Sequence, residues 1–325
     1  MRLKKTPEVI HRIEQIMKHD VAGDPISGLR WTRKTRAKVA EQLQKLGIRI
    51  STTTVGVLLK KMNFSLRVNR KKLCGAPQTP QKSRIRNRQF GYIRRMRELF
   101  TSNNHPVISV DTKKKEQIGN FKNPGNVWCR TSDVVNDHDF PSLATGKAIP
   151  NGVFDVNRNK GIVCVGVSHD TAAFAVDSIE CWWRQEGCHA YKKSHQLLIL
   201  ADSGGSNGAN CKMWKYWLQK KLCDSYNLSV TVCHYPTGAS KWNPIEHRLF
   251  GEISKNWAGV PLRTMETVLK FIRTTKTSAG LQVTAVLNKK YYATKEKLSA
   301  EMEKEINLKQ HAVLPKWNYT IVPKM

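Results

Sequence analysis

The chain has 325 residues, a net charge of +30 and a hydrophobic share of 40%. This share is enough for buried cores in two domains, and the charge predicts a polyanionic partner, either nucleic acid or an acidic membrane surface. The sequence holds no run of about 18 apolar residues and no apolar segment at its start, so we expect neither a membrane-spanning helix nor a signal peptide. Its eight cysteines form no CxxC pair and no zinc-finger spacing, so we expect reduced thiols in a cytoplasmic protein.

The positive charge is concentrated in the first third of the chain. Residues 1–106 hold 25 Lys or Arg and 6 Asp or Glu, a net charge of +19. This asymmetry predicts a basic N-terminal module before a less basic C-terminal one. We place the module at residues 1–75, because Gly75, Pro77 and Pro80 mark a boundary there.

The basic module has the pattern of an all-α helix-turn-helix domain. Apolar spacing predicts helices over residues 7–18, 34–46 and 52–62, with Gly47 ending the second and Ser51 capping the third. The second helix of such a pair enters the major groove of DNA with its first residues. The candidate DNA contacts lie in that helix and just after it: Thr52, Thr53, Thr54, Lys60, Lys61, Arg67 and Arg70. A helical hairpin that binds nothing is the alternative, and the charge favours DNA binding.

A second domain follows a basic amphipathic helix at residues 82–100, which we expect to act as a linker over residues 76–104. Apolar runs then predict five strands, at residues 107–111, 152–156, 162–167, 197–201 and 228–233. Helices are predicted after the third, fourth and fifth strands. This order predicts an α/β fold, with a mixed five-stranded sheet flanked by helices. We place the domain at residues 105–290, with a long insertion at 117–150 and a C-terminal extension at 291–325.

Three carboxylates stand at corresponding places in this pattern. Asp111 ends the first strand, Asp202 ends the fourth, and Glu246 lies in the first turn of the helix after the fifth. Sites in such sheets gather at the carboxyl ends of strands. Carboxylates brought together repel one another, and a divalent cation removes that repulsion. The alternative is that the two aspartates only make turns and that Glu246 forms a capping box with Asn243.

The expected cofactor is a pair of Mg²⁺ ions, with Mn²⁺ as a substitute. Two such ions about 4 Å apart activate a nucleophile and stabilise a leaving oxygen at one phosphodiester. Asp111 would bridge the ions, while Asp202 and Glu246 would each hold one. In a basic protein this chemistry fits the cleavage and transfer of DNA strands.

Further candidate residues flank the three carboxylates. Four lysines are expected to meet DNA phosphates, and two histidines are auxiliary candidates for orienting phosphate or water: Lys113, Lys114, Lys115, Lys241, His234 and His247. The alternatives are solvated loops and structural histidines. The glycine-rich residues 204–208 lack the Gly-Lys-Ser/Thr of a P-loop and the spacing of a dinucleotide fingerprint, so we expect no nucleotide cofactor.

The same blocks carry a resemblance to a known family. ISVDTKKKE at residues 108–116, ADSGGSNG at 201–208 and SKWNPIEHRLF at 240–250 resemble the catalytic blocks of ISAzo13-type insertion-sequence transposases. HDF at 138–140, HDTAAFA at 169–175 and WNYTI at 317–321 are similar to other blocks of that family. The Asn-Pro-Ile-Glu block is also similar to the related Tc1/mariner superfamily. Family members usually have more chain before the helix-turn-helix, so we expect this sequence to be shortened at its start.

The resemblance implies an RNase H-like DDE transposase of bacterial type, with Asp111, Asp202 and Glu246 as the catalytic triad. Its expected partners are double-stranded DNA, both element ends and target, and a second copy of the chain or more. We then expect a nucleoid-associated protein with no membrane partner. A DNA-binding relic or regulator without catalysis, or an RNase H-like nuclease or resolvase, is the alternative function.

Overall fold

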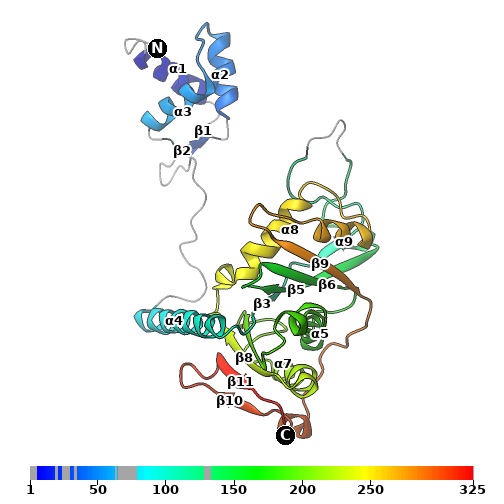
Figure 1. Ribbon diagram of the computed structural model, residues 1–325. Coiled ribbons are helices and arrows are strands. Elements are labelled where there is room, and N and C mark those ends of the chain that lie inside the picture. The colour runs from blue at the N-terminus through cyan, green and yellow to red at the C-terminus, as the bar shows by residue number, and fades with distance from the viewer. Residues whose placement is uncertain are drawn as a thin grey trace. The chain divides into compact units, whose positions relative to one another are not determined.

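The structure is a computed structural model that describes residues 6–18, 21–23, 30–32, 35–62, 64, 79–127 and 133–324. The chain divides into two compact units, residues 1–72 and residues 73–325 (Figure 1). The helix predicted as a linker therefore belongs to the second unit. No helix in the described ranges is both long enough and apolar enough to cross a membrane.

The first unit contains the three predicted helices, α1 (Thr6–Lys18), α2 (Arg36–Lys45) and α3 (Thr52–Lys61). They share one small core: Val9, Ile13, Val39, Leu43, Val55 and Leu58. The Ser51 hydroxyl accepts a hydrogen bond from the Thr54 amide at 3.1 Å, which confirms the predicted cap. The sequence did not predict an antiparallel hairpin of β1 (Val21–Gly23) and β2 (Arg30–Thr32), so the unit is not purely helical.

The second unit is built on one mixed sheet of nine strands in the described part of the chain. All five predicted strands are present: β3 (Val107–Thr112), β5 (Gly146–Asp155), β6 (Lys160–Gly166), β7 (Gln196–Ala201) and β8 (Ser229–His234). Four more strands widen the sheet: β4 (Glu116–Ile118), β9 (Gln282–Asn288), β10 (Leu308–Gln310) and β11 (Asn318–Ile321). The order is β10-β11-β8-β7-β3-β5-β6-β9, and β4 pairs with β5. The predicted five strands are thus the middle of a wider sheet.

Additional strands lie on both sides of the predicted five. β9 pairs in parallel with β6, and β11 pairs antiparallel with β8. The predicted C-terminal extension therefore completes one side of the sheet. Part of the predicted insertion also joins the sheet, because β4 pairs with the first residues of β5.

Helices cover both faces of the sheet (Figure 1). One face packs against α5 (Ala172–Trp182) and α7 (Lys212–Leu218), with Trp182 and Trp214 in its core. The other face packs against three longer segments: α4 (Pro80–Ser102), the helix that ends as α8 (Gly251–Asn256), and α9 (Met265–Arg273). Short helices α6 (Cys188–Ala190) and α10 (Ala300–Lys304) complete the unit.

The alternating side-chain directions along β3 determine on which face of the sheet Asp111 lies. Ile108 and Val110 belong to the core under α5 and α7, and Val107 belongs to the core on the opposite face. Successive side chains of a strand point to opposite faces, so Ser109 and Asp111 share the face of Val107. Asp111 is thereby directed toward the face that carries the Glu246 helix.

Candidate active site

Asp111 and Asp202 come from neighbouring parallel strands at the centre of the sheet. Val110 of β3 and Ala201 of β7 are paired in the ladder, and each aspartate is the next residue along its strand. Carboxyl ends of parallel strands meet at one edge of a sheet, which brings the two side chains together. This is the arrangement that the strand pattern predicts.

Glu246 arrives on a helix that packs closely on the same edge. Gly152 of β5 lies opposite Asp111 in the ladder, and a Cβ at Gly152 would stand 2.7 Å from the Phe250 ring and 2.9 Å from Ile245. The glycine therefore gives the helix room to approach the sheet. Residues Glu246–Phe250 form a π-helical turn, a feature that frequently occurs at functional sites.

The helix begins on a cap that comes from β3, and not on the capping box that was the alternative for Glu246. The Ile245 amide donates to the Ser109 hydroxyl at 3.0 Å, while the Asn243 amide donates to the Ser240 carbonyl at 2.8 Å. In a capping box the Glu246 carboxylate would accept a hydrogen bond from the backbone N–H of Asn243. The Glu246 carboxylate is therefore not used as a cap for its own helix.

Asn243 joins the elements that carry the three carboxylates. Its side chain is fully buried, and its Oδ1 accepts a short hydrogen bond from Ser109 on β3. Its Nδ2 donates to the Asp202 Oδ1 at 3.3 Å and to the Val110 carbonyl at 3.4 Å. One amide thus connects the start of the Glu246 helix to both aspartate-bearing strands.

The three carboxylates act on one another electrostatically. Burial, then the charge of Asp202, then the charge of Glu246 and a hydrogen bond with it raise the pKa of Asp111 to about 8, despite the Thr112 amide that donates to its Oδ1. Burial and the Glu246 charge also raise the pKa of Asp202, against the opposing Asn243 hydrogen bond. Among the described residues, none of the three forms an ion pair with Lys, Arg or His. The group therefore has excess negative charge that the protein does not neutralise.

This donor set fits a divalent cation, because carboxylate oxygens are the ligands that Mg²⁺ and Mn²⁺ favour. Across the described ranges, no three His, Cys, Asp or Glu side chains are already gathered closely enough to hold a metal ion. A cation would therefore draw the three carboxylates closer together. Burial raises the pKa of Asp111 most, followed by the charges of Asp202 and Glu246, and a bound cation would favour the ionised carboxylate against these effects.

Asp170 is a further carboxylate at this edge and was not among the site residues predicted from the sequence. A cavity of about 270 Å³ is lined by Asp111, Asp170 and Asp202 together with Thr112 and the loop 204–207. Asp170 accepts hydrogen bonds from the Thr112 hydroxyl at 3.1 Å and from the Ser206 hydroxyl at 2.9 Å. Thr171 is the residue that caps α5. Asp170 therefore ties the glycine-rich loop to the strand of Asp111.

His234 does not face the substrate side of the site. Its side chain is fully buried, and burial lowers its pKa to about 4. The Asp202 carbonyl can only accept, so the His234 Nδ1 carries a proton and donates to it at 2.7 Å. In the neutral ring, Nε2 then accepts from the Tyr319 hydroxyl, which itself accepts from Trp214. The predicted auxiliary histidine is thus a buried support for the Asp202 backbone.

The predicted basic residues divide into paired and exposed groups. Lys113 forms an ion pair with Glu116 at 2.9 Å and lies 4.5 Å from the centre of the Trp257 ring, so it is a structural residue. Lys114, Lys115 and Lys241 are exposed. His247 is also exposed, and its Nε2 contacts the Lys241 carbonyl.

The predicted DNA contacts of the first unit are only partly described. Thr52, Thr53, Lys60 and Lys61 are exposed on α3, whereas Thr54 is half-buried, with its hydroxyl on Ser51. Arg67 and Arg70 lie outside the described residues.

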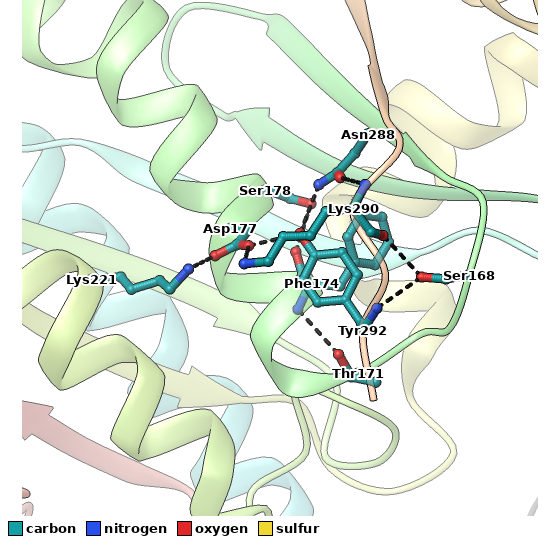
Figure 2. Close-up of polar contacts among 9 residues, drawn as sticks. All are labelled: Ser168, Thr171, Phe174, Asp177, Ser178, Lys221, Asn288, Lys290 and Tyr292. Atoms are coloured by element: carbon teal, nitrogen blue, oxygen red, sulfur yellow. Dashed lines mark hydrogen bonds and ion pairs between the residues drawn. The ribbon is translucent and has the colours of Figure 1, made fainter. Parts of the chain in front are cut away.

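A second polar group lies on the opposite face of the sheet, around the half-buried Asp177 of α5 (Figure 2). Its carboxylate accepts hydrogen bonds from Lys221, from Lys290 at 3.1 Å and from the Tyr292 hydroxyl at 2.7 Å. Burial acts to raise the pKa of Asp177, but the Lys221 and Tyr292 hydrogen bonds and the Lys221 charge together lower it. This group supplies its own cations and does not resemble the edge with Asp111.

Residues 12–323 match a family model described as the Rhodopirellula transposase DDE domain. No curated protein matches the chain. Among solved structures, the Mos1 transposase paired-end complex with left transposon end has a TM-score of 0.45 and 15% identity, over 81% of this chain and 69% of that chain. The Mos1 mariner paired end complex with Mn has a TM-score of 0.44 and 16% identity over the same shares. Likeness this distant carries no argument about the site.

Proposed function

The chain belongs to the transposase DDE domain family and is a DNA transposase, and from that premise we propose that Asp111, Asp202 and Glu246 are its catalytic carboxylates. The observation that supports this assignment most directly is their mutual repulsion at one sheet edge, with no ion-pair partner among the described residues. A folded protein retains such a cluster at a cost in stability, and catalytic sites are where that cost is commonly found.

The proposed reaction has two steps at phosphorus. Water attacks a phosphodiester at the end of the element, the bond from phosphorus to the 3′ oxygen breaks, and that oxygen leaves as a 3′-hydroxyl. This hydroxyl then attacks a phosphodiester of the target DNA, forms the new bond to phosphorus and releases a target strand end. No serine or tyrosine nucleophile is required.

Asp111, Asp202 and Glu246 would hold the divalent cations. When bound, Mg²⁺ or Mn²⁺ would activate the attacking oxygen and stabilise the leaving oxygen. Asn243 and Ser109 keep the Glu246 helix against the two aspartates, while His234 holds the Asp202 backbone. These contacts hold the three elements beside one another, which supports the assignment of the carboxylates to one site.

DNA binding would involve both units. Thr52, Thr53, Lys60 and Lys61 on α3 are proposed to contact duplex DNA, and Lys114 and Lys115 the phosphates near the site. Because transposition joins two element ends, the working form is proposed to be a homodimer or larger, acting on chromosomal DNA in the cytoplasm.

The test is a strand-transfer assay with a plasmid that carries the DNA bordering the gene. We expect cleavage and joining that require Mg²⁺ or Mn²⁺ and that Asp202→Asn abolishes. Glu266→Gln, which changes an exposed glutamate in the first turn of α9, is the control and should leave both steps unchanged. Cleavage that persists in Asp202→Asn would refute the assignment, and cleavage without joining would indicate a nuclease.

A further inference from the structure

Two cations flank a pair of neighbouring aromatic rings between α4 and the loop before the Glu246 helix. The Arg86 guanidinium lies 5.6 Å from the centre of the Phe90 ring, and the Lys241 ammonium lies 5.5 Å from the centre of the Trp242 ring. The Phe90 and Trp242 rings are themselves 6.0 Å apart, with an angle of 74° between their planes. These four residues, Arg86, Phe90, Trp242 and Lys241, form what we term the cation–aromatic row.

The row lies beside the catalytic carboxylates. Trp242 precedes Glu246 by four residues, and the contact between the His247 ring and the Lys241 carbonyl holds their loop on the helix. On the other side, Gln89 of α4 donates to the His234 carbonyl at 2.8 Å, and the His234 ring donates to the Asp202 carbonyl. Both ends of the row are therefore anchored to elements that carry a catalytic residue.

Packing against the core of the sheet explains Phe90 but not Trp242. Trp242 is 56% exposed, which is unusual for a large aromatic side chain. Within the described residues, no carboxylate forms an ion pair with Arg86 or Lys241. The surface therefore presents an accessible ring and two nearby cations that form no ion pair with a described carboxylate.

Neighbouring rings flanked by cations suit a nucleic acid strand, because bases stack on the rings and phosphates meet the cations. In a duplex the faces of the bases are covered by their neighbours. An exposed ring can therefore stack only on a base that is unpaired or at an end. A protein that cuts DNA produces such ends at its own active site.

We propose that the cation–aromatic row binds an unpaired DNA strand end next to the catalytic carboxylates. A base of that strand stacks on Trp242, and its phosphates contact Arg86 and Lys241. This assignment rests on the proposed function, since a strand end arises at this place only if the chain cuts DNA.

The test measures binding of the full-length chain to two labelled duplexes by fluorescence anisotropy, in chelator so that no strand is cut. The duplexes share one sequence, and one carries an unpaired 3′ tail of about four thymidines. We expect wild type to prefer the tailed duplex and Trp242→Ala to lower affinity for it about tenfold, with less than about a twofold change for the blunt duplex. Contacts with the shared duplex cancel in the ratio of the two affinities.

A matched control is present on the same helix. Arg95 of α4 also lies 5.6 Å from an aromatic ring, that of Tyr92, but this ring is bonded to His311 beside the β10–β11 hairpin. Arg86→Gln should reduce the slope of log affinity against log salt concentration for the tailed duplex by the amount expected for about one phosphate contact. Arg95→Gln should leave the preference for the tail unchanged, and Trp242→Phe should retain most of it.

The outcomes separate this inference from the proposed function. An equal loss on both duplexes in Trp242→Ala, no preference for the tail in wild type, or an Arg95→Gln effect equal to that of Arg86→Gln would overturn the row as a strand-end site. If cleavage still required Asp202, the proposed function would stand. Cleavage independent of Asp202 would instead refute the catalytic assignment, whatever the tail preference.

Discussion

Two groups of carboxylates on the two faces of one sheet have opposite electrostatics. Around Asp177, two lysines and a tyrosine donate to a single carboxylate, and its pKa is lowered (Figure 2). Around Asp111, no Lys, Arg or His of the described residues forms an ion pair with the three carboxylates, and the pKa of Asp111 rises to about 8. The residue type and the sheet are the same, so the neighbours decide the direction of the pKa shift.

This contrast separates a structural carboxylate from a functional one. The Asp177 group is complete within the chain and holds α5 to the segment at Lys290 and Tyr292. The Asp111 group is incomplete, and a cation from solution would complete it. The two groups should therefore respond differently to substitution, to pH and to Mg²⁺.

The largest expected effect is on catalysis at the incomplete group. Asp202→Asn should lower strand cleavage at least about a thousandfold, because an amide cannot replace a charged ligand shared with Asp111. Asp177→Asn should retain activity in proportion to the protein that remains folded. Single-turnover cleavage, corrected for the folded fraction measured by tryptophan fluorescence, checks both. Comparable losses in the two variants would remove the contrast.

The second effect is on stability, and its sign should differ between the groups. Asp177→Asn leaves Lys221, whose side chain is 21% exposed, without its anion, and should lower the free energy of unfolding by roughly 2–3 kcal/mol. Asp111→Asn removes repulsion and should raise the free energy of unfolding by roughly 1 kcal/mol in chelator. Urea denaturation of both variants measures the difference. A destabilised Asp111→Asn would show that the three carboxylates do not repel one another.

A smaller effect is expected at Asn243, which positions the carboxylates without being one. Asn243→Ala removes the donor to Asp202 and the acceptor for Ser109, and should lower activity about 10- to 100-fold. The concentration of Mg²⁺ needed for half-maximal cleavage should rise as well, which a purely structural role would not produce. An unchanged Mg²⁺ requirement would mean that Asn243 only supports the fold.

The smallest effect is the pH dependence of stability. The folded pKa of Asp111 lies above that of an unfolded aspartate, about 3.9, so its contribution is full below that value and is lost as pH rises to about 8. In chelator, the melting temperature of wild type relative to Asp111→Asn should therefore fall by a few degrees between pH 5 and pH 8. The lowered pKa of Asp177 gives the opposite sign, with stability lost as pH falls below about 4.

Mg²⁺ provides the control for this pH effect. It should raise the melting temperature of wild type more at pH 8 than at pH 5, because protons compete with the cation for Asp111. It should have little effect on Asp111→Asn at either pH. An equal rise in both proteins would place the bound cation elsewhere.

The sequence predicted the parts of this site that depend on local pattern. Apolar runs located the five central strands, and the carboxylates at 111 and 202 were correctly placed at strand ends. The caps at Ser51 and Thr171 follow from the same local logic, since a cap needs only a hydroxyl before a helix. Family membership was also predicted correctly, because the conspicuous blocks surround these same positions.

Contacts between distant segments could not be predicted in this way. The Ser109 hydroxyl accepts a hydrogen bond from the backbone amide of Ile245, 136 residues away. The Asp170 carboxylate accepts hydrogen bonds from the hydroxyls of Thr112 and Ser206, which lie in two other segments. The sequence also gave no sign that His234 is buried or that Lys113 is paired. It did not reveal β9, β10 and β11, which pair with neighbouring strands of the sheet.

By itself, then, the sequence determined which carboxylates are available and on which kinds of element they lie, because hydrophobic period and turn chemistry act over a few residues. Only the tertiary structure decided that Asp111, Asp202 and Glu246 share one edge with no ion-pair partner in the described part of the chain, while Asp177 has two. A pKa depends on burial and on charges nearby in space, and those are set by strand order and helix packing.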